Sequence, residues 1–192
     1  MKKNIFFYFA ILIIYLSCNT KSHDKQEDFF PVLPFIQNDV ADVDTNLYPI
    51  IKIISKDSLN ADTFFVKREE FRELAKEFLE IPDLTLKKYK KLFLETKFLD
   101  QSLNRVIITY RPKYPEKEEI QRQEILIDPD YEANKVKSLI IDKTIVSGDS
   151  SIQKRMLWQI GKSFQITTII QKSNGEERSN TIKVVWNEIQ KY

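Results

Sequence analysis

Cysteine and histidine are the residue types most often used as nucleophile and general base, and this chain has one of each, Cys18 and His23. A histidine beside a cysteine activates the thiol for acyl transfer. Residues 19–29, which surround His23, are polar and show no apolar period. Because such a segment does not hold an imidazole rigidly in a cleft, the sequence predicts neither a Ser-His-Asp triad nor a histidine general base.

The same residue counts argue against the common metal and nucleotide sites. Zinc, copper and non-haem iron sites are built on several histidine or cysteine ligands, and this chain has one of each. The three glycines, Gly148, Gly161 and Gly175, stand far apart, so they form neither a P-loop nor a dinucleotide-binding fingerprint. We therefore predict no catalytic residue, no metal site, no cofactor-binding residue and no cofactor.

Carboxylate chemistry remains open. Asp42, Asp44 and Asn46 match the first three ligand positions of a calcium loop. Leu47 then stands where the loop requires its glycine, and Ile53 where it requires a bidentate glutamate, so we interpret the segment as an acidic helix end. No local pattern identifies a glycosidase-type pair, whose members come from distant strands. A carboxylate-based hydrolase is therefore the least favoured of our functional hypotheses.

The N-terminus is organised as a secretory leader. Lys2 and Lys3 precede an apolar stretch from Ile5 to Leu16, and the small residue Ser17 then precedes Cys18. The stretch is too short for a membrane-spanning helix, which needs about 20 apolar residues.

Leu16-Ser17-Cys18 resembles the lipobox of bacterial lipoproteins, whose cysteine receives a diacylglyceryl thioether and becomes the mature N-terminus. Tyr15 departs from that pattern, which prefers Leu, Val or Ile. The resemblance covers residues 1–18 and implies lipidation of Cys18, contact with a membrane through the lipid, and a place in the cell envelope. Lipidation of Cys18 would exclude it as a nucleophile. The alternative is an ordinary signal peptide that is cut nearby.

Asn19 follows the cysteine. An aspartate at this position resembles an inner-membrane retention signal of bacterial lipoproteins, so its absence favours the outer membrane. Whether the protein faces the periplasm or the cell surface stays open.

The expected organisation is a signal peptide over residues 1–17, a lipidated N-terminus and flexible tether over residues 18–29, and a single globular domain over residues 30–192. The net charge of the whole chain is +2. Without Lys2 and Lys3 the count is 28 basic residues (30 − 2) against 28 acidic ones, so the mature chain is neutral. A nucleic-acid-binding domain is usually basic, which argues against a nucleic-acid partner.

Two hydrophobic periods predict an α+β fold. A helical period follows Pro31 and recurs from Lys67 to Glu80. Strands are expected at 48–55 and 63–66, and period-two segments follow in close succession. The expected seven C-terminal strands are 92–99, 105–110, 123–128, 136–147, 153–160, 163–172 and 180–187. Without a crossover helix between them, they should form a curved, antiparallel meander with one or two amphipathic helices packed on it.

The size of this sheet leads to two functional hypotheses. Seven strands about 4.8 Å apart span roughly 34 Å, whereas two helices of about 10 Å each cover roughly 20 Å. The remaining apolar face of the sheet must be hidden by curvature of the sheet itself, by the N-terminal segment or by a bound molecule. We expect a non-catalytic binding or assembly module with an envelope protein as partner. The alternative is a carrier or chaperone of an apolar ligand, with a groove lined by residues such as Trp158 and Trp186.

Overall fold

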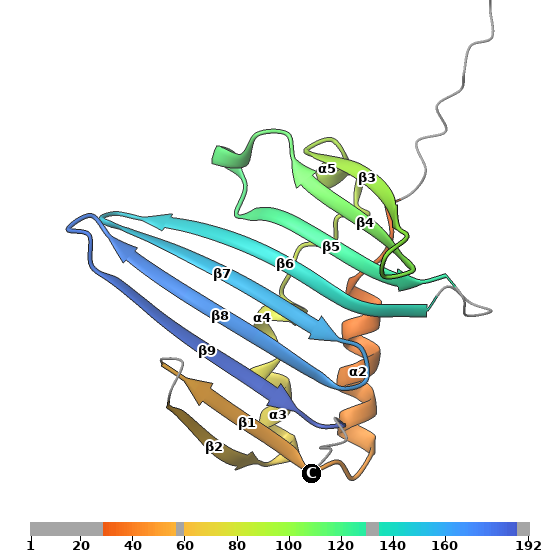
Figure 1. The fold of residues 1–192 in the computed structure, drawn as a ribbon, viewed down its shortest axis with the longest axis vertical. Coiled ribbons are helices and arrows are strands. Elements are labelled where there is room, and N and C mark those ends of the chain that lie inside the picture. The colour runs from red at the N-terminus through yellow and green to blue at the C-terminus, as the bar shows by residue number, and fades with distance from the viewer. Residues whose placement is uncertain (1–28, 57–59, 130–134, 188–192) are drawn as a thin grey trace, which may run out of the picture.

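The computed structural model describes residues 29–56, 60–129 and 135–187. Nine strands form one antiparallel sheet in the order β2-β1-β9-β8-β7-β6-β5-β4-β3 (Figure 1). The strands are β1 (Ile50–Ser55), β2 (Ala61–Val66), β3 (Phe93–Asp100), β4 (Arg105–Pro112), β5 (Ile120–Asp128), β6 (Lys135–Ser147), β7 (Ser150–Gln159), β8 (Ser163–Lys172) and β9 (Glu177–Val185). The predicted α+β class is confirmed. Residues 1–28, which include the predicted signal peptide, Cys18, His23 and the predicted tether apart from Phe29, lie outside the described residues.

The strands β3 to β9 form the expected meander, because each pairs with the next along the chain. Short turns make this possible. Gly148, Gly161 and Gly175 stand in three successive hairpin turns, and all three have positive φ, as does Asn104 in the β3–β4 turn. Gly175 reaches φ 84°, a conformation that costs a residue with a Cβ atom but not glycine. The three glycines, which are too far apart in the sequence to form a phosphate-binding loop, therefore allow the tight turns between strands.

The β1–β2 hairpin extends the sheet on the far side of β9. Ile51 pairs with Val185 and Ile54 with Ile182, so β9, the last described strand, lies inside the sheet rather than at its edge. Strands β2 and β3 form the two edges. The hairpin itself was expected, whereas its place beside β9 has no local signal in the sequence.

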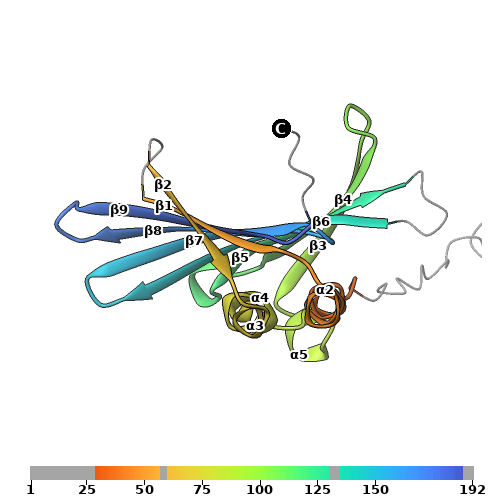
Figure 2. The same cartoon turned by 90° about the horizontal axis from the view of Figure 1, so that it is seen from below.

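The four α-helices of the described residues lie on one side of the sheet (Figure 2). They are α2 (Leu33–Thr45), α3 (Arg68–Leu74), α4 (Lys76–Leu79) and α5 (Lys87–Lys90), and a 3-10 helix, η1 (Pro115–Lys117), precedes β5. The prediction of one continuous helix from Lys67 to Glu80 was wrong, because the helix is interrupted at Ala75. The amide of Phe78 bonds the carbonyl of Ala75, a tighter 3-10-type turn. Phe71 and Phe78 both stay fully buried across the interruption.

An aromatic cluster fills the space between helices and sheet. Trp158 stacks on Phe164 with ring centroids 5.1 Å apart, and Phe78 meets Trp158 edge-on at 5.0 Å. Phe71 meets Trp186 in the same way at 5.1 Å. Such pairs are worth about 0.5–1.5 kcal/mol each beyond their buried area. Both tryptophans are therefore core residues and do not line an open groove.

Two polar contacts fix the N-terminal segment to the sheet. The carboxylate oxygen Oδ2 of Asp39, in α2, accepts hydrogen bonds from Trp158 Nε1 at 2.7 Å and from the Gly161 amide at 2.8 Å. The amide of Phe30 donates to the Tyr110 hydroxyl at 2.7 Å, and that hydroxyl donates to Glu95 Oε2 at 2.7 Å. The first described residues are thereby held beside β3 and β4.

Candidate interaction surface

The side of the sheet that faces away from the helices is the open face, since no helix of the described chain lies over it (Figure 2). Side chains alternate along each strand, so residues next to core positions point to this face. On β7, for example, Trp158 and Met156 are buried on the helix side, whereas Leu157 and Arg155 lie on the open face. The open face is the largest described surface of the sheet that lacks a covering element.

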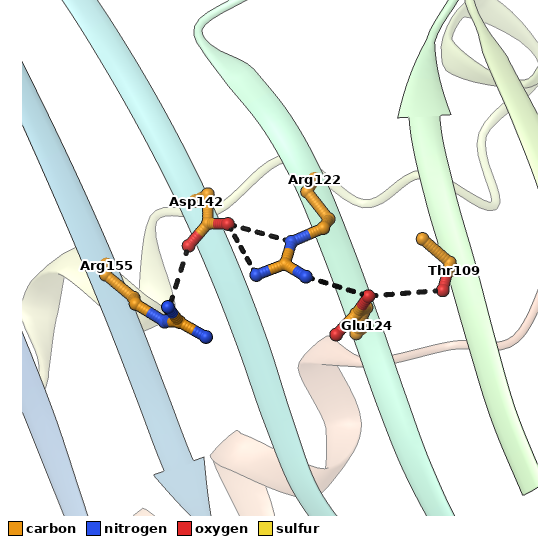
Figure 3. A network of polar contacts seen from close by, with 5 residues as sticks. All are labelled: Thr109, Arg122, Glu124, Asp142 and Arg155. Carbon is orange, nitrogen blue, oxygen red and sulfur yellow. Dashed lines mark hydrogen bonds and ion pairs between the residues drawn. The ribbon is translucent and has the colours of Figure 1, made fainter. Parts of the chain in front are cut away.

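A network of charged side chains crosses the middle of the open face (Figure 3). Arg122, in β5, lies at the centre: its Nε and Nη2 atoms contact Asp142 Oδ2 at 2.8 and 2.7 Å, and its Nη1 contacts Glu124 Oε1 at 3.0 Å. Thr109 Oγ1 bonds the same glutamate oxygen at 3.4 Å. Arg155 Nε lies 4.0 Å from Asp142 Oδ1 on the other side.

Strand register brings these residues together. Thr109 stands opposite Glu124, Arg122 opposite Asp142, and Asp142 opposite Arg155. Directly opposed side chains of an antiparallel pair are close enough to interact. The network therefore runs across four strands, β4 to β7, and is continued on β8 and β9 by Thr167 and Thr181, whose hydroxyl oxygens are 3.0 Å apart.

The network is charge-balanced and half-buried. The Arg122, Glu124 and Asp142 side chains are 21%, 17% and 30% exposed, whereas Arg155 is 66% exposed. Burial disfavours the charged form of Arg122, but the hydrogen bond and charge of Asp142, with the charge of Glu124, outweigh it and raise the pKa of the guanidinium. Two arginines and two carboxylates balance in formal charge, so the network holds no surplus charge to attract a polyanion.

Apolar side chains lie at two corners of the open face. On one side Phe65 is 85% exposed, and it stands in one row with Ile51 and Val185. On the other side Phe98 is 64% exposed and stands in one row with Ile107 and Leu126. Protein interfaces favour exposed aromatic side chains. The polar network beside them keeps one buried acceptor, Asp142 Oδ1, without a hydrogen-bond partner in the described protein. The open face thus offers apolar contacts at its corners around a fixed polar centre.

Two enclosed carboxylates accept hydrogen bonds that hold the fold together. Asp39 bonds Trp158 and Gly161, and Glu95 accepts the Tyr110 hydroxyl, as described above. Two hollows of the described protein are open to solvent and have linings of mixed polar and apolar residues. One of about 760 Å³ at the outer end of β8 and β9 includes Lys56, Glu177 and Arg178 in its lining. One of about 470 Å³ near η1 includes Glu116 and Glu119.

The acidic segment after α2 is occupied by contacts within the protein. Asn46 Nδ2 donates to Asp42 Oδ1 at 2.6 Å, and Asp44 forms an ion pair with Arg72 of α3 at 2.5 Å. Within residues 29–56, 60–129 and 135–187, no group of three or more His, Cys, Asp or Glu side chains is placed to hold a metal ion. The interpretation of Asp42, Asp44 and Asn46 as a helix end agrees with these contacts.

Sequence reasoning did not identify the open-face network. Its one local signal is that Arg122 and Glu124 alternate with Gln123 and Ile125, which places two opposite charges on the same face of one strand. The partners Asp142 and Arg155 come from later strands, and only the register shows that they are neighbours.

No protein-family model, curated protein or solved structure matches this chain. Among the described helices, none has the length and apolar character that crossing a bilayer requires.

Proposed function

We propose that this protein is a lipid-anchored component of the cell envelope that works as a non-catalytic binding or assembly module. One observation carries the proposal: the open face combines a pre-ordered, charge-balanced network with exposed Phe65 and Phe98 and has no covering element among the described residues. Fixed polar groups cost little entropy on binding, because their side chains are already ordered. We expect the partner to be an envelope protein.

The proposed anchor is the lipid on Cys18, supported by the resemblance of residues 1–18 to a lipobox. Phe29 lies eleven residue steps after Cys18 (29 − 18), and a fully extended chain spans about 3.5 Å per step. The body would therefore lie within about 40 Å of the membrane. The segment enters the fold beside β3 and β4, through the bond of the Phe30 amide to Tyr110. For the same reason we place the protein at the envelope, with the outer membrane favoured by Asn19.

Cys18→Ser is expected to abolish membrane attachment. The hydroxyl of serine cannot form the thioether, and the body would then lack its proposed membrane contact. We expect metabolically supplied palmitate to label the wild-type protein and not the variant, and the wild type to sediment with outer-membrane vesicles. Palmitate labelling of the variant at the wild-type level would contradict the anchor. Ser17→Ala, which keeps a small residue before Cys18, is the matched control and should label normally.

Binding through the open face is expected to give a face-specific cross-link in living cells. A photo-reactive residue at Arg155 should form a cross-link of one defined size with an envelope protein, because Arg155 is 66% exposed on the open face. The same residue at Glu73 of α3, which is 77% exposed, is the control on the helix side. Equal products from both positions, or products from Glu73 alone, would contradict the proposal.

The apolar-carrier alternative requires a continuous apolar cavity of a few hundred Å³. The aromatic cluster fills the described space between Trp158 and the helices, and the two hollows described above are open to solvent rather than enclosed. No observation favours the carrier over the binding module, and it remains a prediction from the sequence.

A further inference from the structure

The edge strand β3 exposes an unusual number of apolar side chains. One side of β3 pairs with β4 over its whole length, from Phe93 opposite Pro112 to Asp100 opposite Arg105. The other side faces no strand of the described sheet. Leu94, Phe98 and Leu99 are 55%, 64% and 48% exposed. Proteins usually shorten such an edge or interrupt it with proline, because an open apolar edge pairs with other strands. We infer that two copies of this chain pair through β3, in antiparallel orientation, to form one continuous sheet.

The sequence of β3 is complementary to itself about Thr96. A two-fold axis through Thr96, perpendicular to the sheet, sets Leu94 opposite Phe98 of the second copy. It also sets Glu95 opposite Lys97, twice by symmetry. Leu94, Thr96 and Phe98 lie on the open face of both copies, whereas Glu95 and Lys97 lie on the helix side, as antiparallel pairing requires. Apolar residues thus meet apolar ones, and each carboxylate meets an ammonium group.

Neighbouring registers lose this complementarity. An axis through Glu95 opposes the two Glu95 carboxylates, and one through Lys97 opposes the two ammonium groups. Moving the axis to Leu94 puts Glu95 opposite Phe93, and moving it to Phe98 puts Lys97 opposite Leu99. Like charges directly opposite each other destabilise a strand pair, so the charges of β3 select the register about Thr96.

The Glu95 carboxylate is already positioned for this pairing. The Tyr110 hydroxyl donates to Oε2 at 2.7 Å, which leaves Oε1 towards Lys97, whose Nζ lies 3.3 Å away. In the pair, each Lys97 can contact Glu95 of the other copy, because opposed side chains lie about as close as neighbours on one strand. Tyr110 therefore holds one member of each intermolecular ion pair in place before association.

The other edge does not support the same pairing. About Thr63, Asp62 of β2 would stand opposite Phe64, and about Phe64 it would stand opposite Val66, so no register of these two gives an ion pair. Pairing β2 of one copy with β3 of the next would leave an open edge at each end and give fibres, whereas self-pairing of β3 closes after two copies. A second copy is thus the partner that β3 fits.

A single pair of eight-residue strands is smaller than a standard interface, so the dimer should be weak and concentration-dependent in solution. Confinement to a membrane would raise the effective concentration. The inference goes beyond the proposed binding function and does not depend on it, because pairing through β3 needs neither the anchor nor the open-face partner.

Disulfide trapping tests the register. Thr96→Cys is made in the full chain together with Cys18→Ser, so that residue 96 is the only cysteine and lipidation has no influence. Mild oxidation should give a disulfide-linked dimer, because the two-fold axis places the two residues directly opposite each other. Thr63→Cys on the β2 edge, in the same background, is the matched control and should give at least ten-fold less dimer. Equal trapping at both edges would overturn the inference.

Charge reversal tests the partner chemistry. Adding Lys97→Glu to the Thr96→Cys chain places Glu95 of each copy opposite a second carboxylate, at position 97 of the other copy. The yield of disulfide-linked dimer should then fall at least ten-fold. Adding Glu95→Lys as well restores opposite charges across the axis and should restore trapping. Thermal unfolding is measured on each variant, so that loss of trapping is read only from chains that fold as Thr96→Cys does. Unchanged trapping with Lys97→Glu alone, or no recovery in a folded double reversal, would overturn the pairing.

Discussion

Phe164→Ala should lower the free energy of unfolding by about 3–5 kcal/mol, the usual range for removing a buried phenylalanine side chain. Phe164 is 1% exposed, and its ring lies within aromatic contact of Phe71, Phe78, Trp158 and Trp186. These partners come from α3, α4, β7 and the end of β9. Alanine would leave a cavity at the point where both helices meet the sheet. Urea unfolding followed by circular dichroism measures the change.

Ile170→Ala is the matched control for this substitution. Ile170 lies on the same strand and the same face as Phe164 but is 37% exposed, beyond the aromatic cluster. Truncation of Ile170 should lower the free energy of unfolding by about 1 kcal/mol or less, because solvent can fill the space that its side chain leaves. If the two variants lost equal stability, the cluster around Phe164 would not be the main packed core.

Asp39→Ala should lower the free energy of unfolding by about 2–4 kcal/mol. The carboxylate accepts two hydrogen bonds, from Trp158 Nε1 and the Gly161 amide, and alanine would leave both donors without this acceptor. A buried donor left unsatisfied costs about 1–3 kcal/mol. Asp39→Asn is the control: its amide oxygen can accept both bonds, so its free energy of unfolding should stay within about 1 kcal/mol of the wild type. Chemical denaturation of both variants at neutral pH makes the comparison.

The wild type and Asp39→Asn should also differ in how their free energies of unfolding depend on pH. Burial raises the pKa of Asp39 above its ordinary value of 3.8, against the hydrogen bonds from Gly161 and Trp158, which lower it. The folded state then binds the proton more tightly than the unfolded state. As the pH falls from neutrality through the raised folded pKa towards 3.8, the wild type should gain stability relative to Asp39→Asn. A difference that is constant with pH, or that changes in the opposite direction, would contradict this environment for Asp39.

The local part of the fold could be predicted from the sequence. Period-two segments and the Asn174-Gly175 turn identify the C-terminal strands and their antiparallel pairing, because a short turn permits no other arrangement. The interruption at Ala75 could not be predicted in the same way, since the apolar stripe from Phe71 to Leu79 continues through it. The tighter turn depends on how Phe71 and Phe78 meet Trp186 and Trp158, which are distant in the sequence.

The candidate interaction surface was largely beyond sequence reasoning. A broad one-sided sheet was expected, but which charges would lie side by side depends on register across four strands. Arg122 and Asp142 are partners through the continuous register that runs from this pair to Leu126 opposite Ser138, and a register shift bounds that stretch on each side. The position of the β1–β2 hairpin, which leaves Phe65 exposed at one corner, likewise depends on pairing between distant segments.

The place of β9 between β1 and β8 constrains when the protein can fold. The β1–β2 hairpin emerges early in synthesis, yet its sheet partner is complete only at Val185. Pairing over such a separation is slow, because a long loop must close before the contacts form. A nascent chain therefore cannot complete its sheet until Val185 has been made, and a truncation before β9 removes an interior strand rather than an edge. If the protein is exported as proposed, such delayed folding would keep it in an unfolded, transportable state until β9 is available.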